Sequence, residues 1–155
     1  MERIEEVLSE VLPDIEFEPM INIAHNYAAW EEHYGNKVVI HRKGATLARK
    51  GIVGIISGSQ GTASYIVEGL GNPESFNSCS HGAGRLMPRT MAVKMLDMKT
   101  EAKRLEAKGI VHGIRSQNDM QEASGAYKDI DTVIGNEKDL VRVKTRLLPI
   151  AVIKG

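Results

Sequence analysis

The sequence predicts an α+β fold, in which mixed β-strands and a segregated group of helices form one domain over residues 1–155. Three patterns favour this class: an apolar helical stripe near the start, short strand-like segments bounded by glycine, and a helix-rich stretch over residues 91–108. Strands and helices that occupy separate parts of a chain are typical of α+β proteins. A chain of 155 residues is long enough for one such domain with its own core.

An amphipathic helix is expected at the N-terminus. Its apolar residues follow the spacing i, i+3, i+4, i+7, i+8 and are Ile4, Val7, Leu8, Val11 and Leu12. Pro13 ends this helix, because proline lacks an amide donor and clashes with the preceding turn. The apolar face must pack on another surface.

Three short elements are expected next. Residues 17–23 indicate a strand. Asn26 is placed to cap a short helix over residues 27–31, and His33 would extend from it as a solvated surface residue. Residues 37–40 indicate another short strand.

The middle of the chain predicts two strands, over residues 51–56 and 63–70, joined by the loop Ser57-Gly-Ser-Gln-Gly-Thr62. This order suits a nucleotide cradle, although Gly/Ser turns between strands are common. Further along, Gly109 ends the helix-rich stretch.

The remaining segments predict a strand over residues 110–115, a polar loop over 116–125 and a half-buried strand over 140–147. The basic residues that alternate along the last strand are expected to be solvated.

The composition limits the RNA contacts, the disulfides and the cellular location that can be expected. Twenty basic and twenty acidic residues balance, so any RNA contact must come from a local patch. The single cysteine, Cys79, excludes an internal disulfide and fits a reducing compartment. No apolar run is long enough to span a membrane, and the acidic start is unlike a signal peptide. A cytoplasmic location is the expectation.

The strongest functional signal is the segment Asn77-Ser-Cys-Ser-His-Gly-Ala-Gly-Arg85. Gly82 and Gly84 allow backbone to approach a ligand closely, and successive amides in such a turn can form an anion site. Arg85 adds a planar fork that suits phosphate. His81 therefore resembles a histidine placed against a phosphate, where it could donate a proton, bind metal or attack phosphorus. The bland alternative is a hydrogen-bonded histidine in a glycine-rich turn.

The segment resembles the SHGAGR motif of RtcB-type RNA ligases, and four further motifs in the same order extend the resemblance from about Phe17 to the C-terminus. These are Ile21-Asn-Ile-Ala-His-Asn-Tyr27, Val39-Ile-His-Arg-Lys-Gly-Ala-Thr46, Ser57-Gly-Ser-Gln-Gly-Thr-Ala-Ser-Tyr65 and Ala126-Tyr-Lys-Asp-Ile-Asp131, with a family-like Ile153-Lys-Gly155 at the end. The resemblance implies an RtcB-like fold. It also implies a GTP- and manganese-dependent ligase that joins RNA 3′-phosphate or 2′,3′-cyclic phosphate ends to 5′-hydroxyl ends, as in tRNA splicing and RNA repair.

The resemblance assigns roles to individual residues. It implies that His81 is the histidine that becomes guanylylated and that His25 is a manganese ligand. It implies guanylate contacts from Asn26, Ser57, Gly58, Ser59, Gln60, Ser64, His81, Gly82, Ala83, Gly84, Tyr127 and Lys154. The candidates for RNA phosphate contacts are Arg42, Arg85 and Arg89. His41 and His112 are expected to be packed or hydrogen-bonded, and Cys79 to be a buried small residue.

The chain departs from the family pattern at three positions and in length. Ser57 and Gln60 replace a proline and a methionine of the family loop, and Pro88 replaces a serine. The resemblance covers only the C-terminal part of such a ligase, so the Asp, Cys and other His ligands of the two-manganese site would belong to an N-terminal part. That part is the expected partner, in the same chain or in a separate one.

Two other interpretations stay open. The chain could be a non-catalytic module that binds guanine nucleotide or RNA, or a phosphatase-like hydrolase that uses His81 as a nucleophile. Metal ligands encoded beside the chain would favour the ligase, and their lack would favour the binding module.

Overall fold

A three-stranded antiparallel sheet forms the centre of the fold, and the computed structural model describes residues 2–153 of the chain. Its strands are β4 (Val53–Ile56), β5 (Ser64–Gly69) and β8 (Val141–Leu147), in the order β4-β5-β8. A register shift between Ile66 and Val67 bends the pairing of β5 with β8. Alternate residues of β4 and β5 are buried, as a sheet with one packed face requires.

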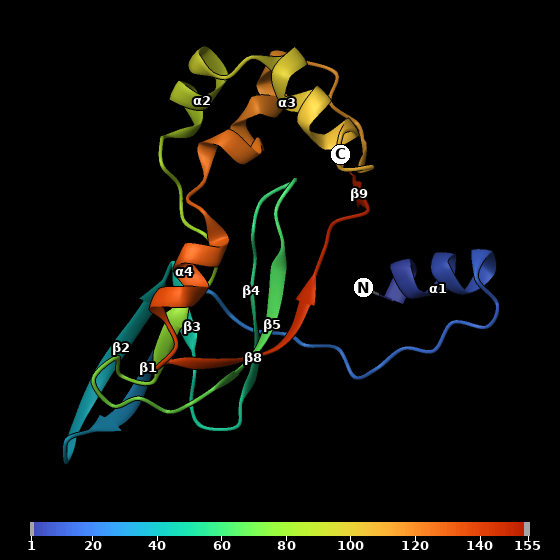
Figure 1. Cartoon of the computed structure of the whole chain (residues 1–155). Coiled ribbons are helices and arrows are strands. Elements are labelled where there is room, and N and C mark those ends of the chain that lie inside the picture. Colours follow the sequence, from blue (N-terminus) through green and yellow to red (C-terminus); the bar gives the residue numbers. More distant parts are fainter. Residues whose placement is uncertain (1, 154–155) are drawn as a thin grey trace.

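Three two-stranded sheets surround this centre. The hairpin β1 (Asn26–His33) and β2 (Asn36–Lys43) is antiparallel, and so is the pair β3 (Ala45–Leu47) and β6 (Ser78–Ser80). The short strands β7 (Val111–His112) and β9 (Ala151–Val152) pair in parallel. The β1–β2 hairpin lies at the opposite end of the molecule from α2 and α3 (Figure 1).

The helices are short, and side-chain caps fix two of them. They are α1 (Glu2–Val11), α2 (Arg89–Met95), α3 (Met98–Glu106) and α4 (Ile130–Asn136), with 3₁₀ turns η1 (Gln117–Glu122) and η2 (Ser124–Ala126). Asp97 and Asp129 cap α3 and α4 by accepting hydrogen bonds from first-turn amides. None of the helices within residues 2–153 is long and apolar enough to cross a membrane.

The core lies between the central sheet, α4 and the strand β6. It contains nine buried apolar residues: Ala48, Ile56, Ala63, Tyr65, Val67, Cys79, Ala83, Ile130 and Val141. This core fixes the two ends of the loop between β4 and β5 and the strand that leads into His81.

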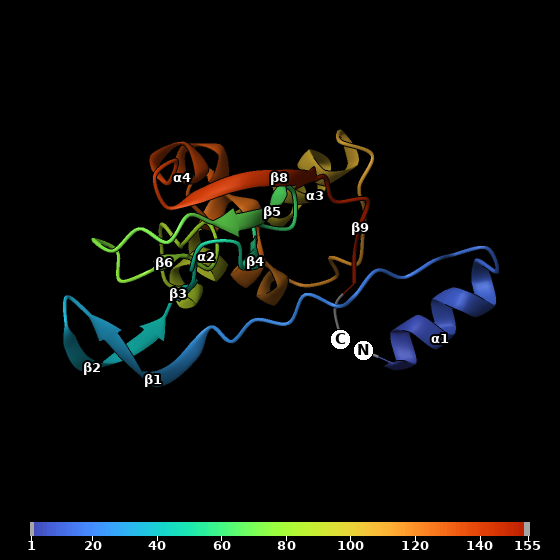
Figure 2. The same ribbon diagram turned by 90° about the horizontal axis from the view of Figure 1, so that it is seen from below.

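Helix α1 lies apart from this body. Both views show it at the end of an extended segment, beside the sheets but not covering them (Figures 1 and 2). No residue of α1 is buried, and Ile4, Val7 and Val11 are each more than half exposed. The structure confirms the N-terminal helix and leaves its apolar face open.

The elements expected over residues 17–40 need two corrections. Residues 17–23 form no strand, and residues 26–33 are the strand β1 rather than a capped helix. The inward side chains of β1 include Glu31 and His33, so the usual alternation of apolar and polar residues is inverted. His33 is consequently buried, not solvated.

The expected strands at 37–40, 51–56, 63–70 and 140–147 and the helix-rich stretch are confirmed, with shifted bounds. The strand expected at 110–115 shortens to Val111–His112, and the polar segment after it forms η1 and η2. These elements agree with the α+β class.

Candidate functional site

A cavity of about 550 Å³ opens where segments distant in the sequence meet. Its lining residues come from the β4–β5 loop, the turn after β6, the start of α2, and η1 with the residue after η2. They are Ser57, Gly58, Ser59, Gln60, His81, Gly82, Ala83, Gly84, Arg85, Arg89, Glu122 and Tyr127. The volume lies within the usual range for small-molecule sites, about 300–1,000 Å³.

The β4–β5 loop is tightly folded on itself. Gly58 admits no side chain, because a Cβ there would lie 2.0 Å from the carbonyl oxygen of Ala63. The Gly58 amide donates to Ser64 Oγ at 3.2 Å, and the Ser59 amide donates to Thr62 Oγ1 at 2.7 Å. The Ser64 hydroxyl therefore supports the loop through the Gly58 amide.

The turn after β6 is fastened to this loop. The Ser57 amide donates to the His81 carbonyl at 3.3 Å, and the Ala83 amide donates to the Ser57 carbonyl at 2.9 Å. A Cβ on Gly82 would lie 2.9 Å from the Ser57 oxygen, so the close approach requires glycine there. The family-like loop and the family-like turn thus form one wall.

His81 is half-buried in this wall and lies beside His25. The two ring centroids are 5.5 Å apart. The His81 amide donates to the Gly44 carbonyl at 3.4 Å, and Gly44 has a positive φ of 76°. His25 immediately precedes β1, so the β1–β2–β3 segment brings the candidate metal ligand to the candidate nucleophile.

The strand β6, which ends directly before His81, is held by a buried carboxylate. Glu137 Oε1 accepts hydrogen bonds from the Ser80 amide, at 2.9 Å, and from the Ser80 hydroxyl. Burial, with the nearby Glu137 charge, raises the pKa of Cys79 to about 12. This thiol is therefore inert at neutral pH, in agreement with its expected packing role.

The opposite wall is a cluster of Arg85, Arg89, Glu122 and Tyr127. Arg85 Nη1 donates to the Tyr127 hydroxyl at 2.9 Å, and its guanidinium carbon lies 4.8 Å from the Tyr127 ring centroid. Tyr127 donates to Glu122, and Arg89 Nε donates to Glu122 Oε1 at 3.0 Å. The cluster fixes the ring of Tyr127 and gathers two cations at the cavity.

The pKa values of this cluster follow from its contacts. Burial acts against the charged form of Glu122, but hydrogen bonds from Tyr127 and Arg89 and the Arg85 charge hold its pKa below the ordinary value. Burial and the hydrogen bond to Glu122 raise the pKa of Tyr127. Glu122 is therefore an anion and Tyr127 a neutral donor at physiological pH.

One polar group in the cavity wall has no partner. Gln60 Nε2 is buried and makes no hydrogen bond within residues 2–153. Burying such a donor unpaired costs about 1–3 kcal/mol. An acceptor supplied by a ligand would remove this cost, so the wall fits a polar ligand such as a nucleotide.

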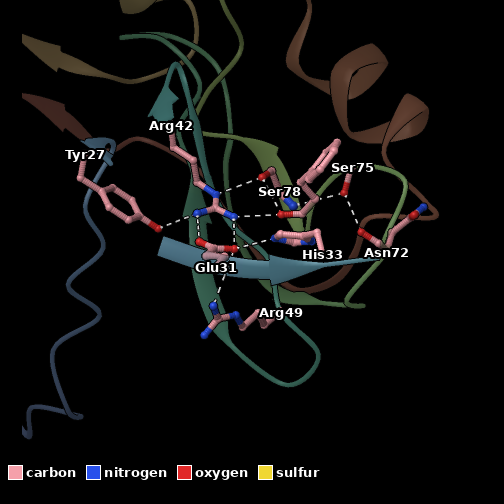
Figure 3. A network of polar contacts seen from close by, with 9 residues as sticks. Tyr27, Glu31, His33, Arg42, Arg49, Asn72, Ser75 and Ser78 are labelled. Atoms are coloured by element: carbon pink, nitrogen blue, oxygen red, sulfur yellow. Dashed lines mark hydrogen bonds and ion pairs between the residues drawn. The ribbon is translucent and has the colours of Figure 1, made fainter. Parts of the chain in front are cut away.

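Arg42 has a different environment from the exposed phosphate contact expected for it. Its side chain is buried and forms an ion pair with Glu31 (Figure 3). Nε donates to Ser78 Oγ at 3.0 Å, and Nη2 donates to the Phe76 carbonyl at 2.9 Å. In this structure no part of its guanidinium faces solvent, so the expected contact with RNA phosphate gains no support from it.

The other expected site residues are placed as follows. Asn26 begins β1 beside His25, with its Oδ1 3.4 Å from His41 Nε2. Arg89 is exposed at the rim of the cavity. His112 is half-buried and accepts a hydrogen bond from the Ile114 amide. Lys154 lies outside the described residues.

Sequence reasoning missed three carboxylates: Glu31, Glu122 and Glu137. Glu122 stands five residues before Tyr127 and outside the Ala126–Asp131 motif, so the motif did not mark it. Glu31 pairs with Arg42 on the next strand and Glu137 with Ser80 on β6, so the sequence next to each carboxylate did not mark its role.

A metal site is not complete in the described part of the chain. No group of three or more His, Cys, Asp or Glu side chains within residues 2–153 is arranged to hold a metal ion. His25 alone provides too few ligands for manganese.

Comparisons with known proteins agree with this geometry. The family described as tRNA-splicing ligase RtcB matches residues 1–155. The RNA-splicing ligase RtcB of Escherichia coli (strain K12) is 45% identical over 135 residues, which cover 87% of this chain and 32% of that protein. The tRNA-splicing ligase RtcB of Thermococcus kodakarensis is 36% identical over 176 aligned positions, covering 99% and 36%.

The chain spans about a third of the length of these relatives. The match nevertheless extends over the whole chain, and it includes the loop, the turn and the Tyr127 segment that line the cavity. The chain belongs to the tRNA-splicing ligase RtcB family.

Proposed function

We propose that this chain is the nucleotide-binding part of a GTP-dependent RNA ligase that joins RNA 3′-phosphate ends to 5′-hydroxyl ends. One observation carries the proposal. The loop at Ser57–Gln60, the turn at His81–Gly84 and Tyr127 are far apart in sequence and line one cavity. A nucleotide needs its base, sugar and phosphate held at once, and this convergence supports such a site.

The chemistry uses His81 as the nucleophile. A lone pair of its imidazole forms a nitrogen–phosphorus bond to the α-phosphate of GTP, while the bond to the β-phosphate oxygen breaks and pyrophosphate leaves. A 3′-phosphate oxygen of RNA then attacks this phosphorus and the bond to His81 breaks. The 5′-hydroxyl of the second RNA finally attacks the activated 3′-phosphate, loses its proton, and displaces GMP.

The neighbouring groups have defined parts in these steps. Arg85 and Arg89 offset the negative charge that grows on the phosphoryl oxygens. Gly82 and Ala83 line the cavity beside His81, and the Ala83 amide holds this wall together by donating to the Ser57 carbonyl. Tyr127, with its ring fixed by Arg85 and Glu122, offers a flat surface for the guanine base.

The metal ion of the reaction is proposed to be Mn²⁺, which would neutralise phosphate charge when bound. The described residues do not complete a site for it, so His25 would act with ligands from the rest of the ligase. That N-terminal part is the proposed partner. Exposed apolar side chains at Trp30, Val39 and along α1 offer it a surface.

The test is the intact mass of the chain after incubation with GTP and Mn²⁺, with and without the N-terminal part of a family ligase. We expect one added GMP in the presence of that part, bound through an acid-labile nitrogen–phosphorus linkage. A separate titration with GTP measures binding without chemistry. GTP binding without any adduct under either condition would favour the alternative, a non-catalytic guanine-nucleotide module, and would overturn the ligase proposal.

A further inference from the structure

We propose that Arg42 is a positioning residue that fixes the separation of His25 from His81, rather than a residue that touches RNA. The proposal concerns the buried cluster of Tyr27, Glu31, His33, Arg42 and Ser78 (Figure 3). Its catalytic consequence rests on the proposed function, while its structural part does not.

The first side of the cluster is the β1–β2 hairpin. Arg42 on β2 pairs with Glu31 on β1 through two guanidinium nitrogens, of which Nη2 is 3.0 Å from Glu31 Oε2. Arg42 Nη1 also donates to the Tyr27 hydroxyl at 3.2 Å. Tyr27 is two residues beyond His25, so these bonds hold the strand end next to the candidate metal ligand.

The second side is the segment that leads to His81. Arg42 Nε and Nη2 donate to Ser78 Oγ and to the Phe76 carbonyl. Ser78 opens β6, which ends at Ser80, one residue before His81. Phe76 and Asn77 have positive φ values of 53° and 51°, so this approach to β6 is a tight turn whose shape depends on such anchors.

One guanidinium therefore joins β1, which follows His25, to β6, which precedes His81. The chemistry explains why it is arginine, because a planar fork with five donors can bind a carboxylate, a hydroxyl and a carbonyl together. A lysine ammonium is a single point charge and cannot span these partners in the same plane.

Glu31, rather than RNA, supplies the anion that pairs with Arg42. Glu31 is itself buried, and it also contacts His33 Nε2 at 2.9 Å and Arg49 Nη2 at 3.6 Å. Arg49 is half-exposed and contacts Glu31 from outside the cluster. Arg49 therefore provides a matched control. It is also an arginine and it contacts the same carboxylate as Arg42, but among the described contacts it has no bond to Ser78 or Phe76.

The structural arm of the test is hydrogen exchange on the chain alone. We expect Arg42→Lys to speed amide exchange at residues 26–33 and 78–82 by at least about 10-fold, while β4 and β5 keep their protection. Arg49→Lys should exchange like the wild type. Unchanged exchange in folded Arg42→Lys would overturn the proposal. If Arg42→Lys does not fold, Glu31→Gln takes its place, since it removes the paired charge and keeps the guanidinium.

The catalytic arm measures GMP adduct formation with the complementing N-terminal part. We expect Arg42→Lys to lower the rate at saturating GTP about 10–100-fold and to raise the Mn²⁺ concentration needed for half the rate. The KM for RNA in the later joining step should stay unchanged. A raised RNA KM with a normal adduct rate would instead make Arg42 an RNA contact and sink the proposal. If the wild type forms no adduct, the proposed function fails, and the exchange result alone decides the positioning role.

Discussion

Two regions of the molecule differ in how firmly contacts within the chain hold them. They are the cavity wall, formed by Ser57–Gln60 and His81–Gly84, and the N-terminal arm, residues 2–24. In the cavity wall, the loop at Ser57–Gln60 and the turn at His81–Gly84 are bonded to each other and rest on a core in which Ile56 is fully buried. In the N-terminal arm, residues 2–24 contribute no buried side chain. The wall is thus held by contacts within this chain, and the arm is not.

This difference matches the two parts of the proposed reaction site, the nucleotide pocket and the metal site. The groups proposed to hold the nucleotide are all fixed by this chain, whereas His25, the single candidate metal ligand, follows directly after the exposed arm. The apolar residues left open on α1 fit the proposed association with the N-terminal part of the ligase.

The largest effect is expected at His81. His81→Ala should abolish the GMP adduct. Among the described residues that line the cavity, none can replace the His81 imidazole as the group that bonds to phosphorus. The measurement is intact mass under the conditions that give an adduct in the wild type. His112→Ala is the control, since His112 lies in β7, and it should keep the adduct. An adduct that persists in His81→Ala would remove His81 as the nucleophile.

A core substitution tests the wall's support. Ile56 ends β4, directly before the loop, and is 0% exposed. Ile56→Ala should lower the free energy of unfolding by about 2–5 kcal/mol through lost burial and a residual cavity. Ile4→Ala on α1 is the matched substitution and should change it by less than about 0.5 kcal/mol. Urea unfolding measures both, and equal losses would show that the arm is packed as tightly as the wall.

The sequence predicted the wall better than the hairpin, for a physical reason. The residues of the wall are mostly glycines and small polar residues with one histidine, and they fall in two short motifs, one at Ser57–Tyr65 and one at Asn77–Arg85. Glu31 and Arg42 are eleven residues apart in sequence, and they meet because β1 pairs with β2. The charge on Arg42 predicted an exposed contact with RNA phosphate. The pairing of β1 with β2 shows that the Glu31 carboxylate neutralises this charge.

The same reasoning explains the misassigned elements. In β1 the inward residues Glu31 and His33 are polar because they face Arg42 and Phe76 rather than an apolar core. A periodicity argument based on apolar residues cannot detect such a strand. The Glu122–Tyr127 pair escaped notice in the same way, because its hydrogen bond joins η1 to the residue after η2.

A pH titration separates the buried cluster from the rest of the molecule. The hydrogen bonds from Arg42 outweigh burial and lower the pKa of Glu31 to about 2. Since this folded pKa is depressed, Glu31 contributes its stability above the unfolded pKa of about 4.5 and loses it as the pH falls through about 2. The contribution is about 3 kcal/mol, on the basis of about 1.4 kcal/mol per pKa unit.

Urea unfolding at several pH values between 2 and about 5 measures this contribution. Glu31→Gln should be less stable at neutral pH and should show a shallower loss on acidification. Glu10→Gln in the exposed arm should keep the wild-type slope. An identical slope in Glu31→Gln would mean that another carboxylate carries the acid sensitivity.

The smallest effect is expected from removing α1 itself. Deletion of residues 2–12 takes away a helix with no buried residue, so it should change the free energy of unfolding by less than about 0.5 kcal/mol. Thermal and urea unfolding of the shortened chain measure this. The same deletion should weaken association with the N-terminal part of a family ligase, because it removes the exposed face of Ile4, Val7 and Val11. Titration calorimetry with that part separates the two roles. A large loss of intrinsic stability would show that α1 packs on the body of this chain, and the contrast between arm and wall would no longer hold.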